Sequence, residues 1–276
     1  MQILTTAAGL RQELDKQNGT VGFVPTMGAL HAGHIALVER CRRECDTVVV
    51  SVFVNPTQFN DPNDLLKYPR TPEADCVLLE KAGTDFVFMP TVDEIYPQED
   101  TRQFGFGPLE QVMEGEHRPG HFNGVAQVVS RLFDIVRPNK AYFGEKDYQQ
   151  LAIIREMVQQ LKLPVEIIGC PIERDTDGLA LSSRNVRLNP AQRAAAPTIY
   201  KTLQEAGGQK TNRSARELTL WITERIDANP ELKTEYITIA DAATLQPVKS
   251  WDEPGMKRVF AAVWAGDVRL IDNIEL

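Results

Sequence analysis

The sequence lacks the features expected of a membrane or nucleic-acid-binding protein. No apolar run approaches the roughly 18–20 residues that a membrane-spanning helix requires. The N-terminal stretch "MQILTTAAGLRQEL" has no basic segment followed by an apolar one, so we do not expect a secretory signal. The net charge of −8 argues against general nucleic-acid binding, because neutralising phosphates requires a basic face. We therefore expect a cytoplasmic protein with no nucleic-acid or membrane partner.

Cysteine is scarce, and several familiar catalytic motifs are missing. The four cysteines (Cys41, Cys45, Cys76 and Cys170) form no CxxC pair and no metal-ligand spacing. Cys41 and Cys45 are one helical turn apart, which is typical of small packed thiols. Neither GxSxG nor the Walker A pattern GxxxxGK[ST] occurs. These absences argue against a serine hydrolase of that type and against a P-loop enzyme.

Strand-like and helix-like patterns alternate through the N-terminal part of the chain. Buried strands are predicted at "TVGFVP", "DTVVVSVFVN", "DFVFMP", "KAYF" and "VEIIGC". Helices are predicted between them, one of which begins at Thr71 as N-cap with Pro72 at its first position and stops at Gly83. This alternation indicates an α/β fold with a Rossmann-like, doubly wound parallel sheet, over residues 1–172.

The pattern changes after Cys170. A polar, turn-rich stretch is followed by two predicted helices, near 190–206 and 214–228, and then by three strand-like segments. We therefore expect a second, smaller α+β domain over residues 173–276. The stretch 55–70 carries three prolines and is predicted to be a long functional loop.

The stretch "VPTMGALHAGH" contains two of the four histidines in the chain. It lies where the first buried strand passes into a helix, and open α/β sheets bind ligands at the carboxyl ends of their strands. Gly28 and Gly33 would allow close approach of the backbone, and the helix start would favour an anion. His31 and His34 could then contact a phosphate. We expect an ATP-phosphate site here; solvated loop histidines and a zinc site are the alternatives.

Two further stretches contain groups suited to a nucleotide. In "FGEKDYQQL", Gly144 permits close approach, Lys146 offers a charge to phosphate, and Asp147 could accept from a ribose hydroxyl. In "LALSSRN", two hydroxyls and Arg184 could bind a polyphosphate. Alone, the first could be a charged helix start with Asp147 as its cap, and the second a plain polar turn.

Amides and a histidine complete the candidates. Asn55 and Gln58 follow the second buried strand, where uncharged amides could bind a polar organic substrate, and Arg118 and His121 come just before a helix. Each could instead stabilise its own loop. Together, the side chains of these stretches favour nucleotidyl transfer by positioning and charge stabilisation rather than through a covalent enzyme nucleophile.

At these residues the sequence closely resembles the pantothenate synthetase (pantoate–β-alanine ligase) family. The matching segments run in order from about Gly22 to Leu276, and the His-x-Gly-His pattern is shared with the wider HxGH nucleotidyltransferase superfamily. The segments that carry the resemblance are "PTMGALHAGH", "VSVFVNPTQF", "YPRT", "HRPGHFNGVA", "FGEKDYQQL", "DGLALSSRN" and "RLIDNIEL".

The resemblance implies two half-reactions. The carboxylate of pantoate attacks the α-phosphate of Mg-ATP to give pantoyl adenylate and pyrophosphate. The amine of β-alanine then displaces AMP, and closure of residues 173–276 as a lid excludes water from the adenylate. The resemblance also implies a homodimer and Mg²⁺ brought with ATP, although no magnesium ligand is identified.

The resemblance assigns a role to each candidate residue. His34, His31, Lys146 and Arg184 would be catalytic, with His34 as the acid that assists pyrophosphate departure. Pantoate and β-alanine would bind at Gln58, Gln150, Asn55 and His121. ATP would bind at Met27, Gly28, Ala29, Leu30, His31, Ala32, Gly33, His34, Gly144, Glu145, Lys146, Asp147, Leu181, Ser182, Ser183 and Arg184.

Two other functions remain open at this stage. An adenylyltransferase of the same superfamily would act on a phosphorylated substrate and should have more Arg and Lys in its site, whereas Gln58 and Gln150 suit a sugar-like carboxylic acid. A non-catalytic ATP-binding protein would have no need for His34, Lys146 and the "SSR" stretch together.

Overall fold

The computed structural model describes all residues from Met1 to Leu276, which form two compact units. The first unit comprises residues 1–106, 118–145 and 150–171. The second comprises residues 107–117, 146–149 and 172–276. Two short segments from the middle of the sequence therefore group with the C-terminal residues.

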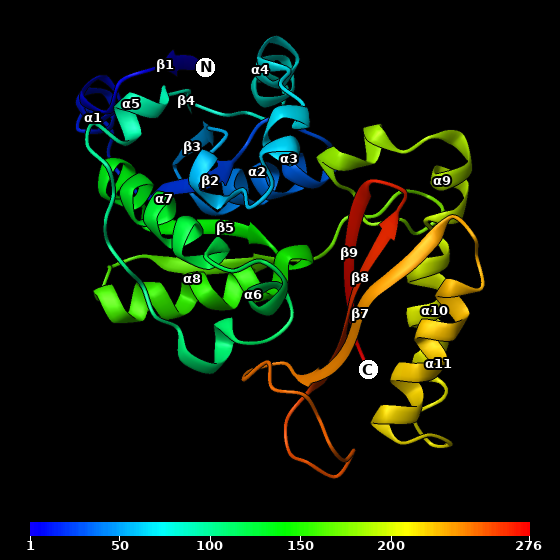
Figure 1. Cartoon of the computed structure of the whole chain (residues 1–276). Coiled ribbons are helices and arrows are strands. Elements are labelled where there is room, and N and C mark those ends of the chain that lie inside the picture. Colours follow the sequence, from blue (N-terminus) through cyan, green and yellow to red (C-terminus); the bar gives the residue numbers. More distant parts are fainter. The chain divides into compact units, whose positions relative to one another are not determined.

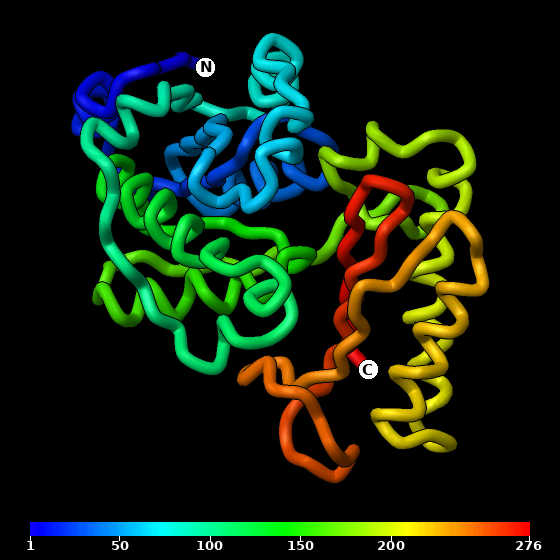
Figure 2. The backbone as a smooth tube through the Cα atoms, in the orientation of Figure 1, coloured from blue at the N-terminus to red at the C-terminus, as the bar shows by residue number.

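A six-stranded parallel sheet forms the centre of the first unit, with the order β1-β4-β3-β2-β5-β6 (Figure 1). Each neighbouring pair is parallel. Figure 2 traces the N-terminal strand, in blue, at one edge of this sheet. The strands are β1 (Gln2–Leu4), β2 (Val21–Thr26), β3 (Thr47–Val52), β4 (Phe86–Phe88), β5 (Lys140–Gly144) and β6 (Glu166–Cys170).

Helices cover both faces of this sheet. On one face, Val38 and Cys41 of α2 and Leu79 of α4 join the apolar side chains of β2, β3 and β4 in one core. On the other face, Phe133 of α7 meets Phe23 and Phe143, from β2 and β5, edge to face. The helices of the chain up to residue 161 are α1 (Ala7–Leu14), α2 (Ala32–Glu44), α3 (Pro62–Lys67), α4 (Pro72–Lys81), α5 (Val92–Ile95), α6 (Glu114–His117), α7 (His121–Val136) and α8 (Tyr148–Leu161).

The predicted α/β class with a doubly wound parallel sheet is confirmed. All five predicted strands are present, because each combines an apolar run with a turn signal at its ends. The long functional loop predicted over 55–70 is not irregular throughout: this stretch contains a 3-10 turn and α3, which begins at Pro62 with Asp61 accepting from the N–H of Asn63. None of the helices is both long and apolar enough to cross a membrane.

The second unit contains a three-stranded antiparallel sheet, β7-β8-β9, of which β8 and β9 form the hairpin drawn in red in Figure 2. Helices α10 and α11 pack on one face of it through a single apolar cluster. One long helix was predicted near 190–206, but Pro197 separates two helices there. The elements are α9 (Pro190–Ala195), α10 (Thr198–Gly207), α11 (Ala215–Asp227), β7 (Leu232–Asp241), β8 (Lys257–Ala265) and β9 (Val268–Glu275).

A buried carboxylate, Asp100, links the segment after α5 to helix α7 through hydrogen bonds to two arginines. Its side chain is only 3% exposed, and it accepts hydrogen bonds from Arg102 Nη2 and Arg131 Nε, each at 2.6 Å. The hydrogen bond from Arg102 is the main cause that holds the pKa of Asp100 well below its usual range, although burial opposes it. The ionised carboxylate therefore contributes to folding stability at neutral pH.

We expect Asp100→Asn to lower the free energy of unfolding by about 2 kcal/mol at pH 7. Since the folded pKa is depressed, this contribution is complete above the unfolded pKa of about 3.9 and is lost as pH falls below it. Urea unfolding of both proteins at pH 7 and pH 3 should therefore show a smaller difference at pH 3. Asp15→Asn, at an exposed position, is the control. A difference that stays equal at the two pH values would contradict the assignment.

Candidate active site

The candidate residues of the first unit gather at one edge of the parallel sheet. Strands β2, β3 and β5 are neighbours, and the chain leaves each of them at its carboxyl end. The turn 27–31 follows β2, Asn55 and Gln58 follow β3, and Gly144 ends β5. Strand β2 has β3 on one side and β5 on the other, so the strand order reverses there. In open α/β sheets this position forms the ligand-binding crevice.

His31 and His34 form a reciprocal cap at the start of α2. Nδ1 of His31 accepts from Gly33 N at 3.2 Å, and Nδ1 of His34 accepts from His31 N at 3.4 Å. The two rings lie 4.1 Å apart between centroids, and both side chains are half-buried. Because each Nδ1 accepts a hydrogen bond, each neutral ring has its proton on Nε2. The pair can therefore present N–H donors to an anion.

The backbone of the turn before His31 is fixed by hydrogen bonds to Asp75 of α4. The carboxylate of Asp75, which is 1% exposed, accepts from Ala29 N at 2.9 Å and from Leu30 N at 2.8 Å. Gly28 and Ala29 both have positive φ values, 76° and 48°, so this turn adopts a left-handed conformation. The backbone N–H groups of Ala29 and Leu30 already donate to Asp75, so we expect the hydrogen bonds to a bound phosphate to come mainly from side chains.

The amide of Gln58 is held in place by buried neighbours. Asn55, 1% exposed, donates from Nδ2 to Gln58 Oε1 and to Gly124 O, each at 3.2 Å, and its Oδ1 accepts from Tyr96 OH at 2.9 Å. Nδ1 of His121 lies 2.9 Å from the backbone carbonyl oxygen of Gln58. The structure thus brings Asn55, Gln58 and His121 together, with Asn55 and His121 placed to support Gln58.

Gly144 and Gln150 flank the turn after β5. A Cβ added at Gly144 would meet no protein atom within 4 Å, so protein packing does not require glycine at this position. The open space is compatible with close approach of a ligand. Gln150, near the start of α8, is half-buried.

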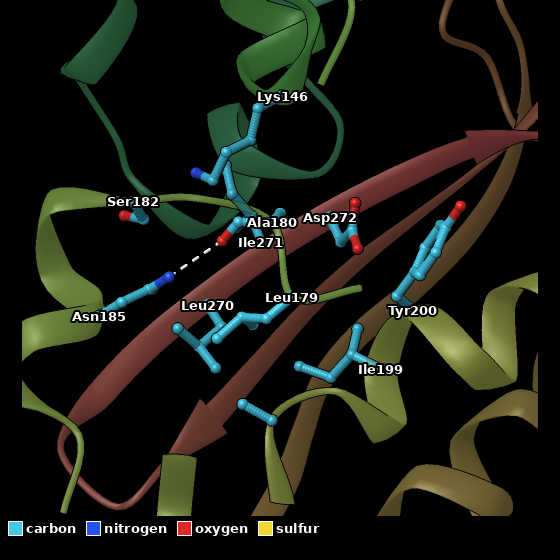
Figure 3. A pocket seen from close by; sticks show the side chains of 11 residues that line it. Lys146, Leu179, Ala180, Ser182, Asn185, Ile199, Tyr200, Leu270, Ile271 and Asp272 are labelled. Atoms are coloured by element: carbon cyan, nitrogen blue, oxygen red, sulfur yellow. Dashed lines mark hydrogen bonds between the residues drawn. The ribbon is translucent and has the colours of Figure 1, made fainter. Parts of the chain in front are cut away.

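The second unit contains the other predicted phosphate contacts. Lys146 and Ser182 border the same small pocket, as Figure 3 shows. Ser182 begins a 3-10 turn by accepting from Arg184 N at 3.3 Å, and the adjacent Asn185 donates to Ala180 O at 3.0 Å (dashed line in Figure 3). Ser183 is buried, whereas Leu181 and Arg184 are half-buried and Asp147 is exposed.

A comparison with protein families decides the identity of this site. The profile of the family described as pantoate-beta-alanine ligase matches residues 2–275. The chain belongs to this family. Its members are ligases, so the chain is an enzyme of the ligase class.

Relatives in the pantoate-beta-alanine ligase family match the chain over its whole length. A pantothenate synthetase of Porphyromonas gingivalis is 53% identical over 278 residues, covering 100% of this chain and 99% of the relative. A crystal structure of pantothenate synthetase from Thermus thermophilus is 49% identical, with a TM-score of 0.92 and coverage of 100% and 99%. That of pantoate-beta-alanine ligase from Francisella tularensis, complexed with beta-gamma ATP and beta-alanine, is 36% identical, with a TM-score of 0.86 and coverage of 100% and 97%.

Two buried polar residues outside the predicted set bind segments that adjoin candidate residues in the sequence. Asp75 holds the turn before His31, and Gln149, adjacent to Gln150, is 4% exposed and binds Glu114 N, Leu109 O and Val112 O. An acidic residue in the first turn of a helix is common, so Asp75 gave no signal in the sequence. Only the folded chain shows that its carboxylate faces another loop.

Proposed function

We propose that the chain condenses pantoate with β-alanine in two steps that consume ATP. In the first step, a carboxylate oxygen of pantoate bonds to the α-phosphorus of ATP, and the bond to the β-phosphate oxygen breaks to release pyrophosphate. In the second step, the amine of β-alanine attacks the acyl carbon of pantoyl adenylate, loses a proton and displaces AMP. Membership of the ligase family and the geometry of the site support this proposal.

His34 and His31 are proposed to serve the leaving pyrophosphate. Because hydrogen bonds to both Nδ1 atoms place the protons on Nε2, each ring can donate toward an oxygen that gains negative charge. His34 is the proposed acid, and His31 a phosphate contact beside it. This histidine pair at the strand-order reversal is the observation on which the proposal chiefly rests.

The remaining groups are proposed to bind the substrates. Lys146 stabilises charge on the α-phosphate, Gly144 and Asp147 contact the ribose, and the stretch 181–184 contacts the β- and γ-phosphates. Gln58 and Gln150 bind pantoate through its hydroxyls and carboxylate. Asn55 and His121 act mainly through Gln58, because their polar atoms already hold its turn.

Magnesium is proposed to enter as part of the Mg-ATP substrate. The donor set of the protein supports this, because no group of three or more His, Cys, Asp or Glu side chains is arranged to hold a metal ion. The same observation counts against the zinc alternative for His31 and His34. Phosphate oxygens and water are the ligands that Mg²⁺ commonly keeps when it accompanies a nucleotide.

The proposal is tested by measuring pyrophosphate and AMP release from Mg-ATP. We expect pyrophosphate with pantoate alone, sustained AMP release only with pantoate and β-alanine together, and neither product with β-alanine alone. Isolation of pantothenate from the complete reaction identifies the amide. ATP turnover that ignores pantoate but responds to a phosphorylated acceptor would instead favour an adenylyltransferase. ATP binding without turnover would favour a non-catalytic protein.

Asp75→Asn is expected to slow pantoate-dependent pyrophosphate release about tenfold. The asparagine keeps one acceptor oxygen but turns an NH₂ group toward one of the two N–H donors of the turn, which displaces His31 and His34. Glu73→Gln, on the same helix but exposed, is the matched control. Steady-state rates together with melting temperatures check this prediction. Full activity in the Asp75 variant would show that the turn holds its shape without the carboxylate.

The wider setting of the enzyme is proposed from the family resemblance. We propose that it works in the cytoplasm, as a homodimer, and that residues 173–276 act as a lid domain over residues 1–172. Sedimentation of the purified chain tests the dimer directly.

A further inference from the structure

No residue of the terminal motif "RLIDNIEL", which forms most of β9, has a role in the reaction proposed above. Two polar neighbours in it, Asp272 and Asn273, are buried at 6% and 2% exposure. Successive residues of a strand point to opposite faces of the sheet. Buried polar groups require hydrogen-bond partners, so each of the two must bind something on its own face.

Asn273 binds the turn that contains Lys146. Its Nδ2 donates to the backbone carbonyl of Lys146 at 3.1 Å, and its Oδ1 accepts from Arg258 Nη1 at 2.5 Å. Both ends of the amide are therefore engaged, one with the turn and one with strand β8.

Aromatic contacts from the same sheet face hold the residue that follows this turn. The guanidinium of Arg258 lies 4.3 Å from the centre of the Tyr148 ring, and that ring is 5.7 Å from the ring of Phe260. Phe260 is the register partner of Asn273, so these groups stand side by side on β8 and β9. The sheet thus contacts the chain at Lys146 and again at Tyr148.

Asp272 binds the segment that leads to Ser182. Its carboxylate accepts from Arg174 Nη1 at 2.7 Å and from Nη2 at 2.8 Å. Arg174 also donates to Gly178 O at 3.1 Å, which closes the hairpin just before the "LSSR" stretch. Figure 3 shows Asp272, Lys146 and Ser182 around one pocket. Adjacent residues of β9 therefore hold the two segments of the second unit that are proposed to contact phosphates.

We propose that Asn273 is a positioning residue for Lys146. A lysine ammonium ends a flexible chain of four carbons, so the position it can reach depends on where its backbone is fixed. The turn 145–147 is a short 3-10 helix, and Asn273 holds the carbonyl in its middle. The inference rests on the proposed role of Lys146 in adenylate formation and extends it to the residue that fixes that lysine.

Asn273→Asp isolates this contact. The aspartate keeps an oxygen for Arg258 but replaces the donor to Lys146 O with a second oxygen, which repels the carbonyl. We expect pantoate-dependent pyrophosphate release to fall about tenfold, because a displaced catalytic group costs rate steeply. Amide formation from supplied pantoyl adenylate and β-alanine, in which Lys146 is proposed to take no part, should change less than about twofold. Asn139→Asp, at an exposed position at the amino end of β5, is the control for the added charge.

A double-substitution cycle separates positioning from a general structural role. In a Lys146→Ala background, measured in single turnover with excess enzyme, Asn273→Asp should cost no more than about a further twofold, because the group it positions is gone. A loss that multiplies with that of Lys146→Ala, or equal loss in both half-reactions, would overturn the inference. So would wild-type rates in Asn273→Asp.

A second variant covers the case in which Asn273→Asp does not fold. Asn273→Gln keeps both amide groups but moves them by one bond, and a loss confined to adenylate formation would again support the inference, whereas equal loss in both steps would overturn it. Wild-type enzyme that releases no pyrophosphate with pantoate would refute the proposed function itself. Wild-type activity that Lys146→Ala removes but Asn273→Asp leaves intact would refute only the positioning role.

Discussion

His34→Ala is expected to lower pantoate-dependent pyrophosphate release by about 10²- to 10⁴-fold, the usual contribution of a general acid. Nδ1 of the ring accepts a backbone hydrogen bond, so Nε2–H is the group proposed to donate a hydrogen bond to the oxygen of the departing pyrophosphate. Alanine removes both the cap that Nδ1 provides to α2 and the proposed acid at Nε2. Single-turnover release of pyrophosphate, measured with saturating ATP and pantoate, checks the prediction.

His34→Asn separates the two functions of the histidine. Its side-chain oxygen can occupy the place of Nδ1 and keep the cap of α2, but it supplies no acid. We therefore expect it to be nearly as inactive as the alanine variant while recovering the stability lost with the cap, about 0.5–1 kcal/mol. His117→Ala, at an exposed histidine stacked on Tyr236, is the matched control. An active His34→Asn enzyme would mean that His34 acts only as a helix cap.

Lys146→Ala is expected to reduce adenylate formation by about 10²- to 10³-fold, with a smaller change in the KM for ATP. Its ammonium would bind the α-phosphate most strongly when charge accumulates there in the transition state. The second half-reaction, started from pantoyl adenylate and β-alanine, should be largely spared. Rates of the two half-reactions, measured separately, check this division.

Lys140→Ala provides the control for Lys146, because Lys140 begins β5, the strand that precedes the turn of Lys146, and pairs with Glu44 at 3.6 Å. Lys146→Arg should recover part of the rate, since the charge returns with a different shape. Equal losses in both half-reactions of Lys146→Ala would point to a misfolded turn rather than to lost charge stabilisation.

The parallel sheet could be predicted from sequence because its strands are continuous apolar runs. The failures lie where a local pattern was short or interrupted. Helix α3 has only six residues and no buried side chain, so apolar periodicity could not reveal it. Pro197 was counted inside a helix, although proline removes a backbone donor and here separates α9 from α10.

Some residues of the candidate site could be predicted from the sequence, and others could not. His31 and His34 could be selected because imidazoles between glycines are unusual in a strand-to-helix turn. Asp75 and Asn273 could not, since their partners, Leu30 and Lys146, lie 45 and 127 residues away in the sequence.

The chain passes between its two units after residues 106, 117, 145, 149 and 171, so no single cut excises the second one. A fragment that begins at Ile172 would lack Glu114, which accepts two hydrogen bonds of 2.8 Å from the half-buried Arg269. It would also lack Tyr148, whose ring lies under Arg258. Recombination between relatives at one crossover would therefore take the two sides of these contacts from different parents. Chimeric enzymes keep all these contacts within one parent only when segments 107–117 and 146–149 are exchanged together with the C-terminal part.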